Sequence, residues 1–160
     1  MMTPAPHRLL SPANCDAVLS LIRRAFAGME GRIDPPSSMH ALTPDGIAEQ
    51  AVRGEVWAIG TPAVACVFLT PKPASLYLHK LAVDPAHRCQ GHARALIGTA
   101  AARASVLGLP ALTLSTRVEL VENHAVFRAM GFTETDRSAH PGYHRPSTIH
   151  FTLPLPGVAP

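Results

Sequence analysis

The sequence predicts an α+β fold: a mixed sheet of six or seven strands, flanked by about four helices, in a single domain that spans residues 1–160. Three observations predict it. Apolar residues at helical spacing alternate along the chain with short strand-like runs, proline and glycine separate these segments, and no repeat or linker divides them. The 160 residues, 47% of them hydrophobic and 16% charged, suffice for one core without disulfides or metals.

The N-terminal third of the chain predicts two helices joined by a loop. Residues 11–28 form the first helix, with Ser11 and Pro12 as its N-cap and first helical residue and Gly28 as its end. Its apolar stripe consists of Val18, Leu21, Ile22, Ala25 and Phe26. The segment that follows contains the Pro-Pro pair of "DPPSS" and predicts a loop. A threonine followed by a proline then begins a short second helix at 43–54.

The rest of the chain predicts strands and helices in alternation. Pro- and Gly-containing turns bound the strands, Gly108 and Pro110 end the long helix, and Gly131 ends the short one. In chain order the segments are strands at 55–60, 63–70 and 75–83, a helix at 90–107, a strand at 111–116, a short helix at 121–132, and two strands around a loop within 133–155.

Composition and charge exclude several classes of function. The net charge is +3, but the basic residues are scattered and aromatics make up only 5%, so no nucleic-acid surface is expected. Neither an apolar run of about 18 residues nor a secretory signal is found, which predicts no membrane span and a cytoplasmic location. Three cysteines at unrelated spacings predict free thiols, and the histidines near the C-terminus have no metal-site spacing, so no metal is expected.

The stretch "HKLAVDPAHRCQGHARALI" predicts an anion site where a helix follows a strand. The first turn of a helix exposes backbone N–H groups and a partial positive charge. Gly91 lets a phosphate approach the backbone, no acidic residue lies nearby, and Arg88 and Arg94 add positive charge. The alternative is an ordinary turn with a glycine that serves packing. Neither a P-loop motif nor a dinucleotide-binding glycine motif occurs.

Two segments resemble landmarks of the GNAT superfamily of acetyl-CoA-dependent N-acetyltransferases. "LAVDPAHRCQGHARAL" is similar to its R/Q-x-x-G-x-G/A signature, and "ENHAVFRAMGF" is similar to its short helix closed by Gly-Phe. The signature residues are Arg88, Cys89, Gln90, Gly91, His92 and Ala93. The resemblance covers nearly the whole chain. It implies a GNAT-like sheet with a splayed central strand pair, and it implies acetyl-CoA as the acyl donor.

The resemblance also implies which residues hold the donor. Exposed backbone groups of Leu81, Ala82 and Val83 would pair with the pantetheine arm. The pyrophosphate would lie on the amides of Cys89 to Arg94, and Asn123 and Phe127 would flank the thiol end.

The implied reaction is direct acetyl transfer to a primary amine of a small molecule or a peptide. Two alternatives stay open: a noncatalytic acyl-CoA-binding domain, and a nucleotide-binding module that uses the same helix end. The sequence leaves the oligomeric state open, a homodimer included.

Two residues are candidates for proton transfer. His79 is the candidate base, because strand alternation puts it on one face with Tyr77, Leu81 and Val83, and because "LYLHKLAV" resembles a histidine-bearing strand of arylalkylamine acetyltransferases. The alternative is a neutral histidine bonded within the sheet.

Phenylalanine stands at position 127, where many family members have a tyrosine acid. Tyr143 in the last loop is therefore the candidate acid, or else it is a loop tyrosine that packs against the core. Glu30, Asp34, Ser37 and Ser38 are candidates for holding the acceptor amine, with a solvated loop as the alternative.

Overall fold

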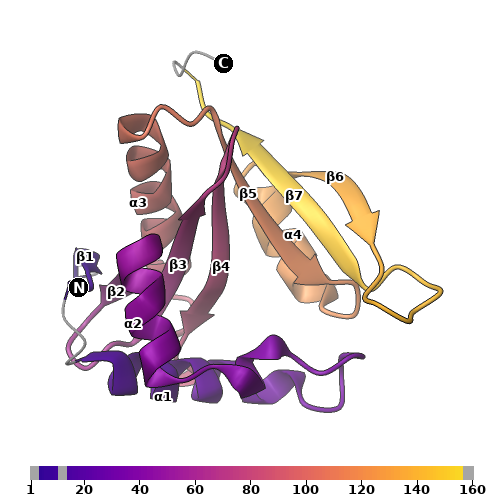
Figure 1. The fold of residues 1–160 in the computed structure, drawn as a ribbon, viewed down its shortest axis with the longest axis horizontal. Coiled ribbons are helices and arrows are strands. Elements are labelled where there is room, and N and C mark those ends of the chain that lie inside the picture. The colour runs from indigo at the N-terminus through magenta and orange to yellow at the C-terminus, as the bar shows by residue number, and fades with distance from the viewer. Residues whose placement is uncertain (1–3, 11–13, 157–160) are drawn as a thin grey trace.

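One seven-stranded sheet runs through the computed structural model, which describes residues 4–10 and 14–156 (Figure 1). The strand order is β1-β2-β3-β4-β5-β7-β6; β4 and β5 run parallel and the other neighbours antiparallel. The mixed sheet is as predicted, with β1 as a two-residue edge strand that sequence reasoning did not identify. The strands are β1 His7–Arg8, β2 Glu55–Ile59, β3 Ala65–Pro71, β4 Leu76–Val83, β5 Ala111–Arg117, β6 Thr133–Ser138 and β7 Thr148–Pro154.

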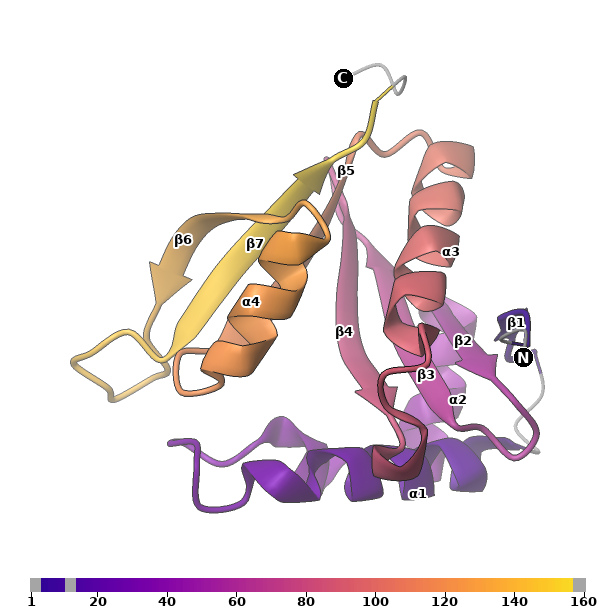
Figure 2. The same ribbon diagram turned by 180° about the vertical axis from the view of Figure 1, so that it is seen from behind.

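In the described part of the chain, four α-helices cover the two faces of the sheet, as predicted. Helices α1 and α2 lie on one face, and α3 and α4 lie on the other, which Figure 2 shows from behind. The helices are α1 Cys15–Phe26, α2 Pro44–Arg53, α3 His92–Val106 and α4 Val121–Ala129, with short 3-10 turns η2 Ala27–Met29, η3 Ser38–Ala41 and η4 Pro85–His87. The predicted cap residues Ser11 and Pro12 lie outside the described residues.

The core consists of two apolar clusters, one on each face of the sheet. Leu21 and Ile22 of α1 pack with Phe68 on the first face. On the second face, Leu96 of α3 packs with Leu78. These residues are at most 2% exposed, so each helix stripe predicted from the sequence stabilises the sheet by burying apolar surface.

A buried ion pair fastens α3 to β2. The Glu55 carboxylate, 5% exposed, accepts two hydrogen bonds of 2.8 Å from Arg103 and one of 2.8 Å from the indole of Trp57. Burial by itself raises the pKa of Glu55, but these hydrogen bonds outweigh it and hold the pKa below its ordinary value. The carboxylate is therefore ionised and paired at neutral pH.

Strands β4 and β5 pair over only part of their length. The parallel register joins Leu76–Leu78 to Leu112–Leu114, whereas β4 continues to Val83 and β5 continues to Arg117. Beyond the paired segment the two strands diverge, which Figure 1 shows as a V-shaped opening of the sheet. The splayed central pair implied by the family resemblance is thus present.

A β-bulge in β4 changes which face its residues occupy. Phe68 pairs with His79, and Cys66 pairs with Ala82. Between these two pairs, β4 therefore contains one residue more than β3. The extra residue is accommodated at Lys80, whose φ of 52° is left-handed.

The predicted common face of His79, Leu81 and Val83 is therefore wrong. The ring of His79 contacts Phe68 on the face of α1 and α2. Leu81 and Val83 pack against the core on the face of α3 and α4. The physical reason is that one inserted residue reverses the period-two alternation.

Candidate functional site

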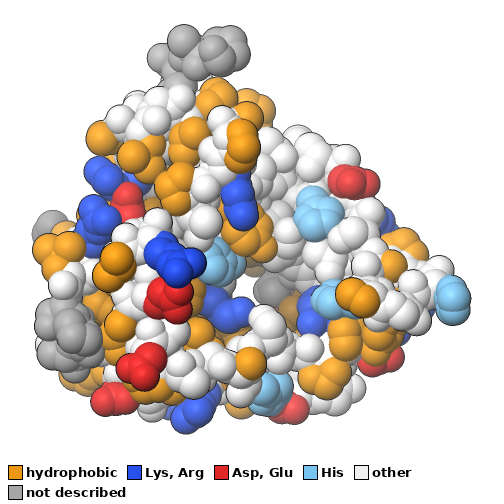
Figure 3. All heavy atoms as spheres, in the orientation of Figure 1, with side chains coloured by type: hydrophobic (Ala, Val, Ile, Leu, Met, Phe, Trp, Pro, Cys, Tyr) orange, Lys and Arg blue, Asp and Glu red, His pale blue; other side chains and the backbone are white. Residues whose placement is uncertain are grey.

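A cleft of about 490 Å³ lies where β4 and β5 diverge. Its walls come from β4, β5, the β6–β7 hairpin, α4 and the segment that follows α1. Figure 3 shows the hollow on this face, with Lys, Arg and His side chains around it. The volume is within the range of small-molecule sites, about 300–1,000 Å³.

The N-terminus of α3 has the backbone geometry of an anion site. Gly91 precedes the helix with a φ of 83°, a conformation that glycine adopts without strain. The first helical hydrogen bond runs from the Ala95 amide to the Gly91 carbonyl at 3.0 Å, so the amides of residues 92–94 come before it. The first turn carries no acidic residue. This arrangement fits a pyrophosphate.

The side chains around this turn offer fewer contacts to an anion than the motif suggested. The Arg88 guanidinium donates to the carbonyl of Ala25 at the end of α1 at 3.2 Å, and Cys89, Gln90 and Arg94 are exposed. The His92 ring is only 4% exposed, and neither of its ring nitrogens has a hydrogen-bond partner within the described chain. The imidazole of His92 is therefore buried, and the group of this residue that is available to an anion is its backbone amide.

The diverging edge of β4 and helix α4 face each other across the cleft. Leu81 lines the cleft on the β4 side, while Ala82 is buried at 2% exposure. Asn123 and Phe127 line the α4 side, and α4 begins at Val121, as predicted. The edge of β4 beyond its paired segment has no partner in β5, so its backbone groups are open to an extended ligand.

His79 lines the same cleft and is held in one orientation. Its Nε2 lies 3.0 Å from the Thr70 hydroxyl, which Gln50 of α2 contacts in turn at 3.1 Å. The imidazole stacks on Tyr77 at 5.2 Å between ring centroids and meets the edge of Phe68 at 5.4 Å. These contacts fix the ring, as a base requires.

The electrostatic surroundings keep His79 neutral. Burial, together with the charges of Lys80 and Lys72, lowers its pKa from 6.5 to about 4. The imidazole is therefore neutral at neutral pH, and one of its two nitrogens carries a lone pair. It is a weak base whose protonated form is costly in this position.

Tyr143 does not line the cleft, contrary to the prediction that the last loop points it there. Its hydroxyl donates to the Asp34 carboxylate at 2.5 Å, and this hydrogen bond raises the pKa of the tyrosine. Arg145 also contacts Asp34, at 3.5 Å. The interaction joins the loop after α1 to the loop between β6 and β7. Of the two tyrosines in the chain, the one that lines the cleft is Tyr77.

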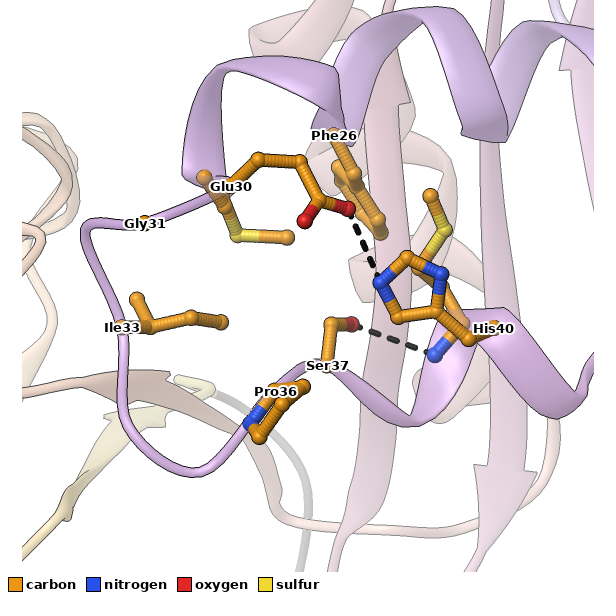
Figure 4. A pocket seen from close by; sticks show the side chains of 9 residues that line it. Phe26, Glu30, Gly31, Ile33, Pro36, Ser37 and His40 are labelled. Atoms are coloured by element: carbon orange, nitrogen blue, oxygen red, sulfur yellow. Dashed lines mark hydrogen bonds and ion pairs between the residues drawn. The ribbon is translucent and has the colours of Figure 1, made fainter.

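The four predicted acceptor residues divide into two groups. Ser37 and Ser38 line the cleft. Glu30 instead contacts the His40 imidazole, with 2.9 Å between the Glu30 Oε1 and the His40 Nε2, beside a smaller pocket of about 50 Å³ (Figure 4). Asp34 is bonded to the last loop. Both predicted carboxylates therefore already have partners within the protein.

Sequence reasoning missed two cations that line the cleft. The Lys80 ammonium donates to the Ser38 hydroxyl at 3.0 Å, and Arg117 donates to the carbonyls of Pro35 and Pro36 at 2.6 and 3.1 Å. Alternation along β5 puts Arg117 on the half-buried face, which was a usable signal. For Lys80 there was none, because the bulge sets its position.

A chain of polar groups lines the opposite wall. His150 lies between two serines, 2.7 Å from the Ser115 hydroxyl and 2.8 Å from the Ser138 hydroxyl. The imidazole and the two hydroxyls give this wall hydrogen-bonding groups for a ligand.

Comparisons with known proteins agree with this geometry. The model of the acetyltransferase (GNAT) family matches residues 21–132. The chain belongs to this family. A search of the curated proteins finds no match. The protein is an acyltransferase, and acetyl-CoA is its acyl donor. No helix within residues 4–10 and 14–156 has the length and apolar character of a membrane span.

Solved structures of low sequence identity share the fold of the GNAT chain. The ribosomal-protein-S18-alanine N-acetyltransferase from Escherichia coli has a TM-score of 0.72 at 20% identity, covering 94% of this chain and 93% of that one. An N-acetyltransferase from Thermoplasma acidophilum, in complex with coenzyme A, has a TM-score of 0.75 at 11% identity, covering 94% and 99%. A GNAT acetyltransferase from Elizabethkingia anophelis, with acetyl-CoA bound, has 0.64 at 17% identity, covering 94% and 97%.

Proposed function

We propose that the protein is an N-acetyltransferase that moves an acetyl group from acetyl-CoA to a primary amine of a small molecule or peptide by direct attack. The observation that carries this proposal is the cleft between β4 and β5. It brings an open strand edge, the fixed imidazole of His79 and the Asn123 side of α4 around one space.

Different groups of the chain bind the donor, stabilise the developing charge and accept the proton. The amides at the start of α3 bind the pyrophosphate, and the open edge of β4 binds the pantetheine arm. Backbone N–H groups near Leu81 and Ala82 stabilise the negative charge that develops on the carbonyl oxygen. His79 accepts the proton that the attacking amine loses, and Thr70 and Tyr77 orient its ring.

A dedicated tyrosine acid is not needed for this reaction. Acetyl-CoA supplies a thioester carbonyl and a thiol leaving group whose pKa is near that of an ordinary thiol, about 8.5. Phe127 has no hydroxyl, and the hydroxyl of Tyr143 is bonded to Asp34. The proton that the leaving thiolate takes up therefore comes from solvent. Tyr143 instead positions the acceptor loop.

The free thiols support a location in the reducing cytoplasm. Cys15 and Cys66 are buried and Cys89 is exposed, and none of them is in a disulfide.

The test is an assay of thiol release. The purified protein is mixed with acetyl-CoA and a panel of primary amines, and both free thiol and acetylated amine are measured, with an amine-free mixture as control. Transfer predicts equal amounts of the two products. Binding of CoA without thiol release from any amine would instead identify a noncatalytic acyl-CoA-binding domain, and tighter binding of ATP than of CoA would identify a nucleotide-binding module.

A further inference from the structure

The charged side chains that line the cleft are all basic. Among the described residues that form its walls, Lys80 and Arg117 are charged and none is acidic. Neither cation has a carboxylate within ion-pair distance in the described chain. A half-buried charge without a counterion is costly, so a ligand that brings a negative charge is favoured at this place.

The excess charge in the cleft corresponds to about one cation. Asp34 and Glu119 lie near Arg117 and offset its charge, although neither lines the cleft. Within residues 4–10 and 14–156, the hydrogen-bond partner of the Lys80 ammonium is the neutral Ser38 hydroxyl, at 3.0 Å. A monoanion therefore matches the site better than a dianion.

Both cations keep hydrogen-bond donors for a ligand. An ammonium has three N–H donors, and Lys80 uses one for Ser38. A guanidinium has five, and Arg117 uses two for the carbonyls of Pro35 and Pro36. The remaining donors suit a carboxylate, which accepts charge-assisted bonds on two oxygens. This anchor is adjacent in sequence to His79, the proposed base.

We propose that the acceptor is a small amine that also carries a carboxylate, and that Lys80, supported by Arg117, binds this carboxylate while the amine faces His79. The inference rests on the proposed N-acetyltransferase function and names its substrate class. The cleft of about 490 Å³ must hold the acyl end of the donor as well as the acceptor, which limits the acceptor to the size of an amino acid. The cations also oppose protonation of the bound amine, which keeps the nucleophile neutral.

The experiment compares matched acceptor pairs. Glycine, β-alanine, 4-aminobutyrate, leucine and phenylalanine are each tested against their own amides, with aminomethylphosphonate as the dianionic probe. The amide keeps the size and removes the charge. We expect kcat/KM for at least one acid to exceed that of its amide by about tenfold or more, the effect of one charge-assisted hydrogen bond. A preference for the amides or for the phosphonate would overturn the proposal.

Variants of the two lysines locate the effect. Lys80→Met should raise the KM of the preferred acid about tenfold more than that of its amide, whereas Lys80→Arg should retain the preference. Lys72→Met is the matched control: Lys72 is the only other lysine, it does not line the cleft, and both lysines lower the pKa of His79. Equal effects of Lys80→Met on acid and amide would remove Lys80 as the carboxylate anchor.

The two proposals fail in different ways. If no amine of any kind is acetylated, the proposed function fails. If uncharged amines are acetylated and the amino acids are not, acetyl transfer stands and the carboxylate specificity is wrong.

Discussion

Replacing His79 by glutamine tests the proposed base most directly. Glutamine keeps a polar group beside the Thr70 hydroxyl but does not accept a proton at neutral pH. General bases contribute about 100- to 10,000-fold. A pKa of about 4 makes this imidazole a weak base at pH 7, so we expect the lower end, a fall in kcat of about 100-fold. CoA affinity, measured by calorimetry, should stay the same.

The pH dependence gives a sharper form of the same test. The acceptor's own ionisation affects parent and variant alike. The kcat/KM of the parent divided by that of the variant therefore reports the ionisation of His79 alone. The base acts when deprotonated, so the ratio falls as pH falls through its pKa. With a pKa of about 4, roughly 99% of His79 is neutral at pH 6, against roughly a quarter at the ordinary value of 6.5.

We therefore expect a constant ratio of kcat/KM values from pH 8 to about pH 5.5. A ratio that falls severalfold by pH 6 would contradict the buried, low-pKa environment. A ratio near one at every pH would show that His79 is a structural histidine of the sheet.

Three further substitutions test the anion site, the loop contact and the buried ion pair. Gly91→Asn, compatible with a φ of 83°, should weaken CoA binding about tenfold in a titration with little change in melting temperature; an unchanged affinity contradicts the phosphate site. Tyr143→Phe should raise the acceptor KM about threefold at constant kcat, because its hydroxyl bonds a loop; a lower kcat at constant KM would restore it as the acid. Arg103→Met should lower the free energy of unfolding in urea by about 3 kcal/mol by leaving Glu55 unpaired, and Arg53→Met, in an exposed pair, by less than about 0.5 kcal/mol; equal losses contradict this ranking.

Local patterns in the sequence determined the secondary structure apart from β1, and they determined the turn of the proposed phosphate site. The strand that ends at Val83, the acid-free helix start and Gly91 lie within a few residues of one another. The exposed N–H groups of this turn follow from local backbone geometry, which the neighbouring residue types determine. Together with the second landmark on α4, they also predicted the family and its acyl donor, which the family match confirms.

Tertiary structure alone decided how the cleft is lined. The bulge at Lys80 depends on the register between two strands, and it separates His79 from Leu81 although the two are close in sequence. Tyr143 lies outside the cleft because its hydroxyl meets Asp34, 109 residues away. Such pairings depend on how loops from distant segments converge. The sequence therefore specified the backbone turn of the proposed phosphate site, whereas packing of the whole chain set the charge of the proposed acceptor site.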